Sequence, residues 1–217
     1  MTALQASTAA AVDAARDELV ALAHSLHAEP ELAFAEYRSA AKLTDALAQH
    51  GFQVRRGVAE LPTAFDATFG SGQLVIGLCA EYDALPEVGH ACGHNVIAAA
   101  ALGAGLALAA VADELGITVR VLGTPAEETG GGKVLMLSRG VFDDVAAAMM
   151  VHPAPQETVA APSLALAASP SATPARRVTQ RPPRTWAATR PTPSPWRRWP
   201  SGCCVSTWSP NRWCTAW

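Results

Sequence analysis

Side chains that can bind a metal or transfer protons occupy three short segments of this 217-residue chain. Cys92 and His94 lie two residues apart in a glycine-containing loop. Glu127 and Glu128 are adjacent, and His152 follows an apolar segment. A thiol, imidazoles and carboxylates are the ligands that a borderline-soft divalent cation such as zinc selects. These residue types, each placed just after a predicted strand, predict a metal-dependent hydrolase.

Each of these residues taken singly also has an ordinary structural explanation. A Cys and a His in one loop are more often structural than functional, a Glu pair can belong to a solvated loop, and a lone His after a strand can lie on the surface. The combination is more specific. Adjacent carboxylates at a strand end repel each other unless a cation or solvent relieves them. One of the pair can bind a metal while its neighbour polarises a water molecule.

Two further acidic residues follow the apolar segment that ends at Cys79. Either Glu81 or Asp83 could orient a metal ligand or bridge two metal ions. The alternative for Asp83 is a turn residue ahead of Pro86. We therefore include Asp83 among the candidate catalytic residues.

The hydrophobic pattern predicts an α/β domain. Helices are predicted at residues 8–28, with Ser7 as the cap, and at 36–50, 96–115 and 132–138. Strands are predicted at residues 52–56, 63–69, 74–79, 117–123 and 146–151. Alternation of strands and helices indicates a mostly parallel sheet with helices on both faces. Ligands of such sheets bind beyond the carboxyl ends of the strands, where all the candidate residues are expected.

Several segments, taken in order and spacing, resemble one enzyme family. They are LHAEPEL at residues 26–32, EYDALP at 81–86, HACGHN at 90–95, PAEE with GGG at 125–132, and VHP at 151–153. Residues 20–168 resemble the catalytic domain of the M20 family of metallopeptidases and amidohydrolases. The similar branch contains N-acyl-amino-acid amidohydrolases, aminoacylase-like proteins and aminobenzoyl-glutamate hydrolases.

The resemblance implies a zinc-exopeptidase-like domain that hydrolyses the amide bond of N-acyl amino acids, dipeptides or related small amides. It implies that Cys92, His94, Glu128 and His152 bind one or two ions of Zn²⁺, Mn²⁺ or Co²⁺. It also implies that Glu127 is the general base. Many relatives have Asp and Met at the positions of Glu81 and Tyr82, ahead of the shared Asp83.

The composition changes near residue 170. All six tryptophans lie at or beyond Trp186, the last acidic residue is Glu157, and residues 170–217 hold eight arginines and no lysine. We therefore divide the chain into a partial catalytic metal-binding domain at residues 1–169 and an aberrant tail at 170–217. Arg and Pro with scattered Trp cannot build a core, so we expect the tail to be disordered.

A one-base shift of reading frame explains the tail. Written in GC-rich codons and shifted, residues 177–183 give Arg-His-Ala-Ala-Ala-Ala-Pro, which resembles the lid-histidine motif of the family. In the same frame residues 196–201 give Val-Ala-Gln-Val-Ala-Ile, and residues 203–208 give Leu-Leu-Arg-Gln-His-Leu. We expect a truncated, frameshifted chain without the lid and dimerisation domain, impaired or inactive, and no oligomer. A basic nucleic-acid-binding arm is the alternative for the tail.

The remaining features of the sequence argue against several classes of protein. Residues 1–169 carry 19 acidic and 8 basic residues, which argues against nucleic-acid binding by the folded part. The apolar residues 96–111 are too few to span a bilayer, and the start of the chain lacks a secretory pattern. We expect a cytoplasmic enzyme whose partner is a small amide substrate. A non-catalytic remnant that binds a metal or a partner is the alternative function.

Overall fold

The computed structural model describes residues 2–154, so the tail predicted at residues 170–217 lies outside the described residues. The helices are α1 (Ala3–Ala14), α2 (Arg16–Ala28), α3 (Tyr37–Gln49), α4 (His94–Ala109), α5 (Ala112–Leu115) and α6 (Gly132–Ser138), with a short 3-10 helix η1 (Val58–Glu60). The strands are β1 (Gln53–Arg56), β2 (Phe65–Phe69), β3 (Leu74–Ala80), β4 (Ile117–Gly123) and β5 (Ala147–Met149).

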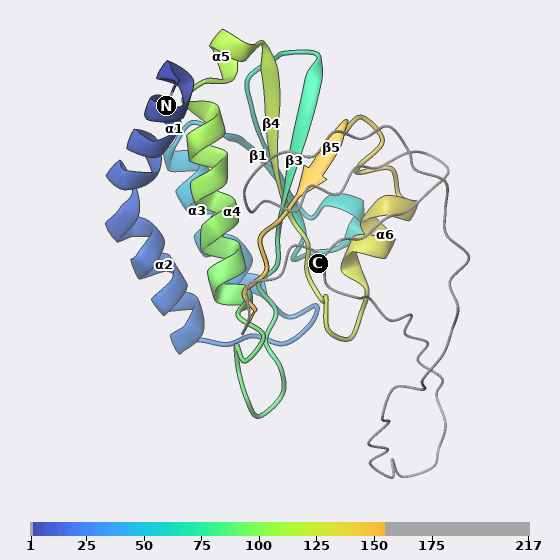
Figure 1. Cartoon of the computed structure of the whole chain (residues 1–217). Helices are drawn as coiled ribbons and strands as arrows, with labels where there is room; N and C mark the ends of the chain where they lie inside the picture. Colours follow the sequence, from blue (N-terminus) through green and yellow to red (C-terminus); the bar gives the residue numbers. More distant parts are fainter. Residues whose placement is uncertain (1, 155–217) are drawn as a thin grey trace, which may run out of the picture.

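The five strands form one sheet in the order β1-β2-β4-β3-β5. β3 is parallel to β4 and to β5, whereas β2 is antiparallel to both β1 and β4. β2 is therefore the one reversed strand of this sheet, and the predicted mostly parallel α/β sheet is confirmed. The carboxyl ends of β3, β4 and β5 meet at one edge, the lower end in Figure 1, where α4 also begins.

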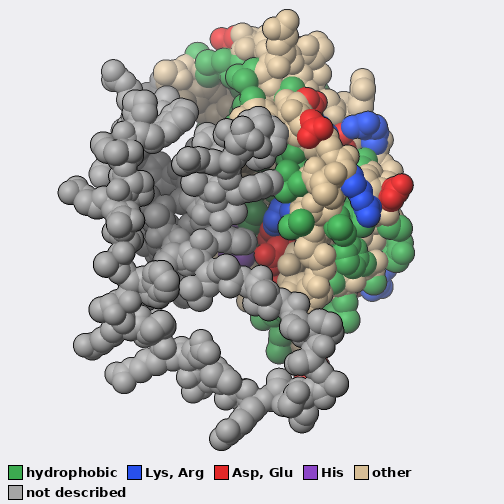
Figure 2. Space-filling model, turned by 90° about the vertical axis from the view of Figure 1, so that its right-hand side faces the viewer, with side chains coloured by type: hydrophobic (Ala, Val, Ile, Leu, Met, Phe, Trp, Pro, Cys, Tyr) green, Lys and Arg blue, Asp and Glu red, His purple; other side chains and the backbone are tan. Residues whose placement is uncertain are grey.

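Helices cover both faces of the sheet, as predicted. α1, α2, α3 and α4 lie on one side, and η1 and α6 lie on the other (Figure 1). The first side holds the larger core, which includes Leu26, Leu43 and Leu102. The second holds a smaller core around Met136 and Phe142. The face turned to the viewer in Figure 2 mixes acidic, basic and apolar side chains over the described residues.

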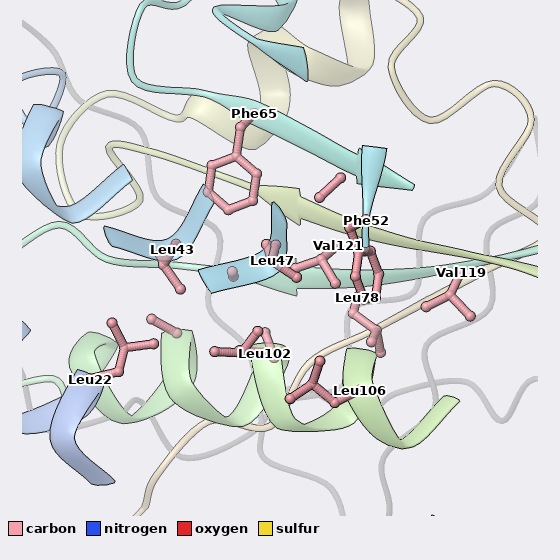
Figure 3. Close-up of a cluster of buried hydrophobic side chains, with 14 of the residues drawn as sticks. Leu22, Leu43, Leu47, Phe52, Phe65, Leu78, Leu102, Leu106, Val119 and Val121 are labelled. Atoms are coloured by element: carbon pink, nitrogen blue, oxygen red, sulfur yellow. The ribbon is translucent and has the colours of Figure 1, made fainter. Parts of the chain in front are cut away.

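The larger core is built from leucines of α3 and α4 against the sheet. In Figure 3, Leu102 and Leu106 of α4 point toward Leu78 of β3 and Val121 of β4. Burial of each such side chain contributes about 1.5–3 kcal/mol. This packing fixes α4 on the sheet and thereby fixes the place where α4 begins, at His94.

The predicted first helix is two helices in the structure. α1 ends at Ala14 and α2 begins at Arg16, and Ala15 between them has φ −90° and ψ 0°. The expected Ser7 cap is also wrong. Thr2 caps α1 in a reciprocal capping box with Gln5, so the helix begins earlier than the hydrophobic pattern suggested.

A buried ion pair joins β2 to β4. Nε of Arg120 donates to Oδ1 of Asp66 at 3.1 Å, and Nη2 donates to Oδ2 at 2.9 Å. Arg55 contacts the same carboxylate, and Arg120 also contacts Asp144. Burial alone would raise the pKa of Asp66, but the hydrogen bonds and charges of the two arginines outweigh it and lower that pKa. No helix among the described residues is both long and apolar enough to cross a membrane.

Candidate metal centre

The candidate residues meet beyond the carboxyl ends of three parallel strands. Glu81 and Asp83 follow β3, Glu127 and Glu128 follow β4, and His152 follows β5. His94 is the first residue of α4, which packs against β3 and β4. The topology therefore brings together residues that are far apart in sequence, as parallel sheets do.

His94 is held by Asp83 in one orientation. Its Nδ1 atom lies 2.8 Å from the backbone oxygen of Asp83 and 3.0 Å from Oδ1 of the same residue. Both partners are acceptors, so Nδ1 carries the proton and Nε2 presents its lone pair. Carboxylate support of this kind fixes the tautomer of metal-binding histidines. Burial alone would lower the pKa of His94, but Asp83 outweighs it and raises that pKa.

The second ring nitrogen of His94 faces three carboxylates. Nε2 lies 3.4 Å from Oε2 of Glu81, 3.7 Å from Oε1 of Glu128 and 3.9 Å from Oε2 of Glu127. Neither Nε2 of His94 nor Oε2 of Glu81 has a hydrogen-bond partner among the described residues, although both are buried. Two groups have ligand atoms within 4.8 Å of one another: Glu81 with His94 and His152, and His94 with Glu127 and Glu128.

Cys92 is connected to this cluster of side chains by its contact with Glu128. Its hydrogen bond to Glu128, together with burial, raises the pKa of the Cys92 thiol to about 11. The neighbouring carboxylates of Glu127 and Asp83 act in the same direction. The protein alone therefore keeps this thiol protonated. A cation between the thiol and the carboxylates would reverse the local charge and favour the thiolate.

Glu127 has the environment of a general base. About a quarter of its side chain is exposed, so it can reach solvent. Burial, followed by the charge of Glu128, raises its pKa above the ordinary value for glutamate. A raised pKa makes a carboxylate a better proton acceptor near neutral pH.

Asp83 also fixes the Glu127–Glu128 turn. Its Oδ2 atom accepts a hydrogen bond from the backbone N–H of Glu128 at 3.1 Å. Burial alone would raise the pKa of Asp83, but hydrogen bonds from His94 and from the backbone of the turn lower it. One carboxylate therefore orients the imidazole and the turn at once, which is the orienting role considered from the sequence.

His152 is brought to the centre by a close backbone approach at Gly93. Gly93 has φ +81°, and a Cβ there would lie 2.9 Å from Cγ of Pro153. Glycine allows both the left-handed conformation and the contact. The rings of His94 and His152 meet edge to face, with centroids 6.1 Å apart. Nδ1 of His152 lies 2.7 Å from the backbone oxygen of Pro153, so Nδ1 carries the proton and Nε2 is the nitrogen that can bind a metal.

Glu36 is a residue of this region that the sequence did not single out. It is fully buried, and its Oε1 accepts the backbone N–H of Ala126 at 2.8 Å. Its Oε2 accepts the hydroxyl of Thr63 at 2.8 Å. Ala126 has φ +56°, an uncommon conformation for a residue with a side chain. Glu36 therefore holds the backbone immediately before Glu127.

We expect the Glu36→Leu variant to be less stable than the wild type. The change leaves two buried donors, the Ala126 N–H and the Thr63 hydroxyl, without acceptors, at about 1–3 kcal/mol each. Glu36→Gln retains an amide oxygen for Ala126, so its loss should be much smaller. Urea unfolding of the three proteins measures this difference. Equal stability of Glu36→Leu and the wild type would contradict the assignment.

The centre has the donors and the charge that a divalent cation requires. A thiol, two imidazoles and several carboxylates surround buried atoms that lack hydrogen-bond partners within the described part of the chain. The carboxylates lie too far from Nε2 of His94 for good hydrogen bonds, yet close enough to share one ion with it. Of the four residues predicted as ligands, His94, Glu128 and His152 belong to these two groups, whereas Cys92 belongs to neither and is linked to the cluster by its hydrogen bond to Glu128.

Solved structures share this fold. A Bacillus subtilis protein described as a dinuclear metal-binding peptidase from the M20 family superposes with a TM-score of 0.61 and 29% identity, over 68% of this chain and 46% of that one. A putative aminohydrolase from Staphylococcus aureus superposes with a TM-score of 0.59 and 26% identity, over 65% of this chain and 40% of the other.

Curated proteins are similar in sequence. One of the subunits of the Escherichia coli p-aminobenzoyl-glutamate hydrolase is 41% identical over 66% of this chain and 34% of its own length. A mouse Xaa-Arg dipeptidase is 38% identical over 75% of this chain and 41% of its own length. The chain thus spans less than half of these relatives. Residues 77–184 match the model of peptidase family M20/M25/M40, and with its fold and its cluster of candidate metal ligands the chain belongs to the M20 peptidase family.

Proposed function

We propose that the catalytic domain represented by this chain hydrolyses the amide bond of N-acyl amino acids or small dipeptides with the help of a divalent cation. The observation that carries this proposal is the set of carboxylate oxygens 3.4–3.9 Å from Nε2 of His94. These distances are too long for good hydrogen bonds between the carboxylates and Nε2, and they are suited to an ion that both groups bind.

In this proposal Cys92, His94, Glu128 and His152 hold the ion. Because a cysteine is among the ligands, we favour Zn²⁺ over harder cations. When bound, such an ion acidifies a water molecule and polarises a carbonyl oxygen. Asp83 accepts a hydrogen bond from Nδ1 of His94, so that Nε2 is the nitrogen of the neutral ring that faces the ion. Glu127 accepts a proton from the attacking water and returns it to the nitrogen of the leaving amine.

The substrate class follows from the relatives. They include a subunit of a p-aminobenzoyl-glutamate hydrolase, an Xaa-Arg dipeptidase and a Bacillus subtilis N-acetyl-L-cysteine deacetylase. All three names describe cleavage of an amide that involves an amino acid. A cytoplasmic location remains part of the proposal, since Cys79 and Cys92 are free thiols and Cys92 must be reduced to bind a metal.

Removal of the metal is expected to abolish turnover. When a form whose reading frame is restored after residue 169 is dialysed against a chelator, its hydrolysis of an N-acyl amino acid should fall to background and should return when Zn²⁺, Mn²⁺ or Co²⁺ is added back. The metal-loaded protein should also unfold at higher temperature, because a ligand of the native state stabilises it. Full activity of the metal-free protein would refute the proposal.

The frameshift remains a prediction that concerns residues outside the described part. The nucleotide sequence around codons 165–175, with an intact mass, tests it directly. We expect the 217-residue chain to be inactive and a frame-corrected form, in which the reading frame after residue 169 is restored, to be active. Comparable turnover by the two forms would overturn the prediction. A corrected form that binds metal without turnover would favour the non-catalytic alternative.

A further inference from the structure

A basic side chain, Lys133, contacts the candidate metal centre. It lies in the first turn of α6, and its ammonium contacts Oε1 of Glu81. Glu81 is fully buried, whereas 27% of the Lys133 side chain is exposed. Within residues 2–154, no other lysine or arginine forms an ion pair with the carboxylates that surround His94. Glu81 is therefore the point at which a fixed positive charge meets the centre.

The second oxygen of Glu81 faces the position expected for a metal ion. Oε2 lies 3.4 Å from Nε2 of His94, and neither of these buried atoms has a hydrogen-bond partner within the described part of the chain. Bonds of about 2.0–2.2 Å from one tetrahedral ion place a nitrogen ligand and an oxygen ligand about 3.4 Å apart. Glu81, His94 and His152 also form one of the two groups whose ligand atoms lie within 4.8 Å of one another. The two oxygens of Glu81 can therefore serve two different cations.

A carboxylate shared by two cations binds each of them less tightly than it would alone. The ammonium of Lys133 neutralises part of the charge of Glu81, and it repels a divalent ion on the other oxygen, because like charges in a buried site disfavour each other. In the metal-free protein the same ammonium stabilises Glu81, since a buried carboxylate without a partner is costly. Burial lowers the pKa of Lys133 to about 8, so the side chain is mainly an ammonium at pH 7.

We propose that Lys133 and the metal are coupled through Glu81: Lys133 holds this carboxylate in place in the metal-free protein and lowers the affinity of the centre for the ion. The ion concerned is the one that Nε2 of His94 binds, and the coupling does not depend on how many ions the centre holds. The inference rests on the proposed function, because it assumes that the cluster binds a metal. Lys133 touches no substrate in this proposal and is a positioning residue.

The test measures two quantities at pH 7 in the full 217-residue protein. One is the urea midpoint of the metal-free form, and the other is the affinity for Mn²⁺, from electron paramagnetic resonance of the free ion. Mn²⁺ is the probe because thiols, such as those of the cysteines beyond residue 200, select softer ions. Lys133→Met removes the charge from a side chain of similar length, and Lys133→Arg keeps the charge. Lys42→Met is the matched control, since Lys42 is 28% exposed and pairs with Glu29, which is not part of the centre.

Metal-free Lys133→Met should unfold at a lower urea concentration than the wild type, because the charge of Glu81 is then buried without a partner. Its affinity for Mn²⁺ should nevertheless rise by about 5–150-fold, the usual range for coupled sites. Lys133→Arg and Lys42→Met should bind Mn²⁺ as the wild type does. In a Glu81→Gln background, Lys133→Met should no longer change the affinity, because the shared carboxylate is absent. If circular dichroism shows that metal-free Lys133→Met is not folded, Lys133→Gln, which keeps a hydrogen-bond donor for Glu81, takes its place with the same expectations.

An affinity of Lys133→Met for Mn²⁺ that equals or falls below that of the wild type overturns the inference and leaves the proposed function intact. An unchanged urea midpoint of the metal-free variant does the same. Equally tight binding in Lys133→Arg and Lys133→Met also overturns the inference, since the charge is then irrelevant, and so does a gain in affinity that persists in the Glu81→Gln background. A wild type that binds neither Mn²⁺ nor Zn²⁺ removes the proposed function together with the inference.

Discussion

The Glu127→Gln variant of the frame-corrected protein is expected to lose turnover by a factor of about 10²–10⁴ while its metal content stays that of the wild type. Loss of a general base typically costs this much, equivalent to about 3–5 kcal/mol in the barrier. The amide cannot accept the proton of the attacking water, yet it has nearly the same shape as the carboxylate. Steady-state rates on an N-acyl amino acid and metal analysis of the same samples measure the two quantities.

Glu128→Gln provides the contrast. Glu128 contacts Cys92 and is assigned as a ligand, so its replacement should weaken metal binding itself by at least about tenfold. Activity should then recover in part at high metal concentration, whereas that of Glu127→Gln should not. Equal metal loss in the two variants would show that the roles of the two glutamates are assigned wrongly.

Asp66→Asn should destabilise the fold by about 3–5 kcal/mol, because removing one partner of a buried ion pair leaves the other charge uncompensated. Arg120 is 6% exposed, and its remaining partner, Asp144, is largely exposed. Asp45→Asn is the control, since Asp45 and Arg56 form an exposed pair of the kind worth about 0–1 kcal/mol. Urea unfolding of both variants against the wild type gives the comparison. Similar losses of unfolding free energy in the two variants would contradict the larger contribution assigned to the buried pair.

The same pair makes stability depend on pH in acid. The pKa of Asp66 is lowered in the folded state. Its contribution to the free energy of unfolding is therefore fully present above the pKa of an aspartate in the unfolded chain, about 3.9. The contribution is lost as the pH falls through the lower folded value. Asp66→Asn should therefore show a flatter decline of unfolding free energy than the wild type below about pH 4. Identical acid profiles would place the native charge of Asp66 in doubt.

The sequence predicted the elements well because their periodicity is strong and their ends are marked by glycine and proline. It predicted one helix at residues 8–28 because apolar residues recur through the break at Ala15, where the angles change without a Gly or Pro to signal it. The four ligand candidates could be placed together because each follows a strand or opens a helix of a parallel sheet.

Other parts of the centre lay beyond sequence reasoning. Glu36 carries no local signal, since it acts on Ala126 in a segment that only folding brings near. Lys133 looks like an ordinary helix residue until Glu81 is seen to be fully buried beside it. The sequence places Glu81 near the centre, but only the structure shows that one of its oxygens contacts Lys133 and the other faces His94.

The hydrogen bond from Ala126 to Glu36 joins residues 90 positions apart. During synthesis α3 emerges long before the Glu127–Glu128 turn, so the turn acquires its final shape only after β4 has docked beside an N-terminal unit that is already present. A chain shortened from its N-terminus past Glu36 would keep every proposed metal ligand and still lack the acceptor that shapes the turn. The N-terminal segment therefore helps to shape the proposed active site, although it supplies none of the proposed reacting groups.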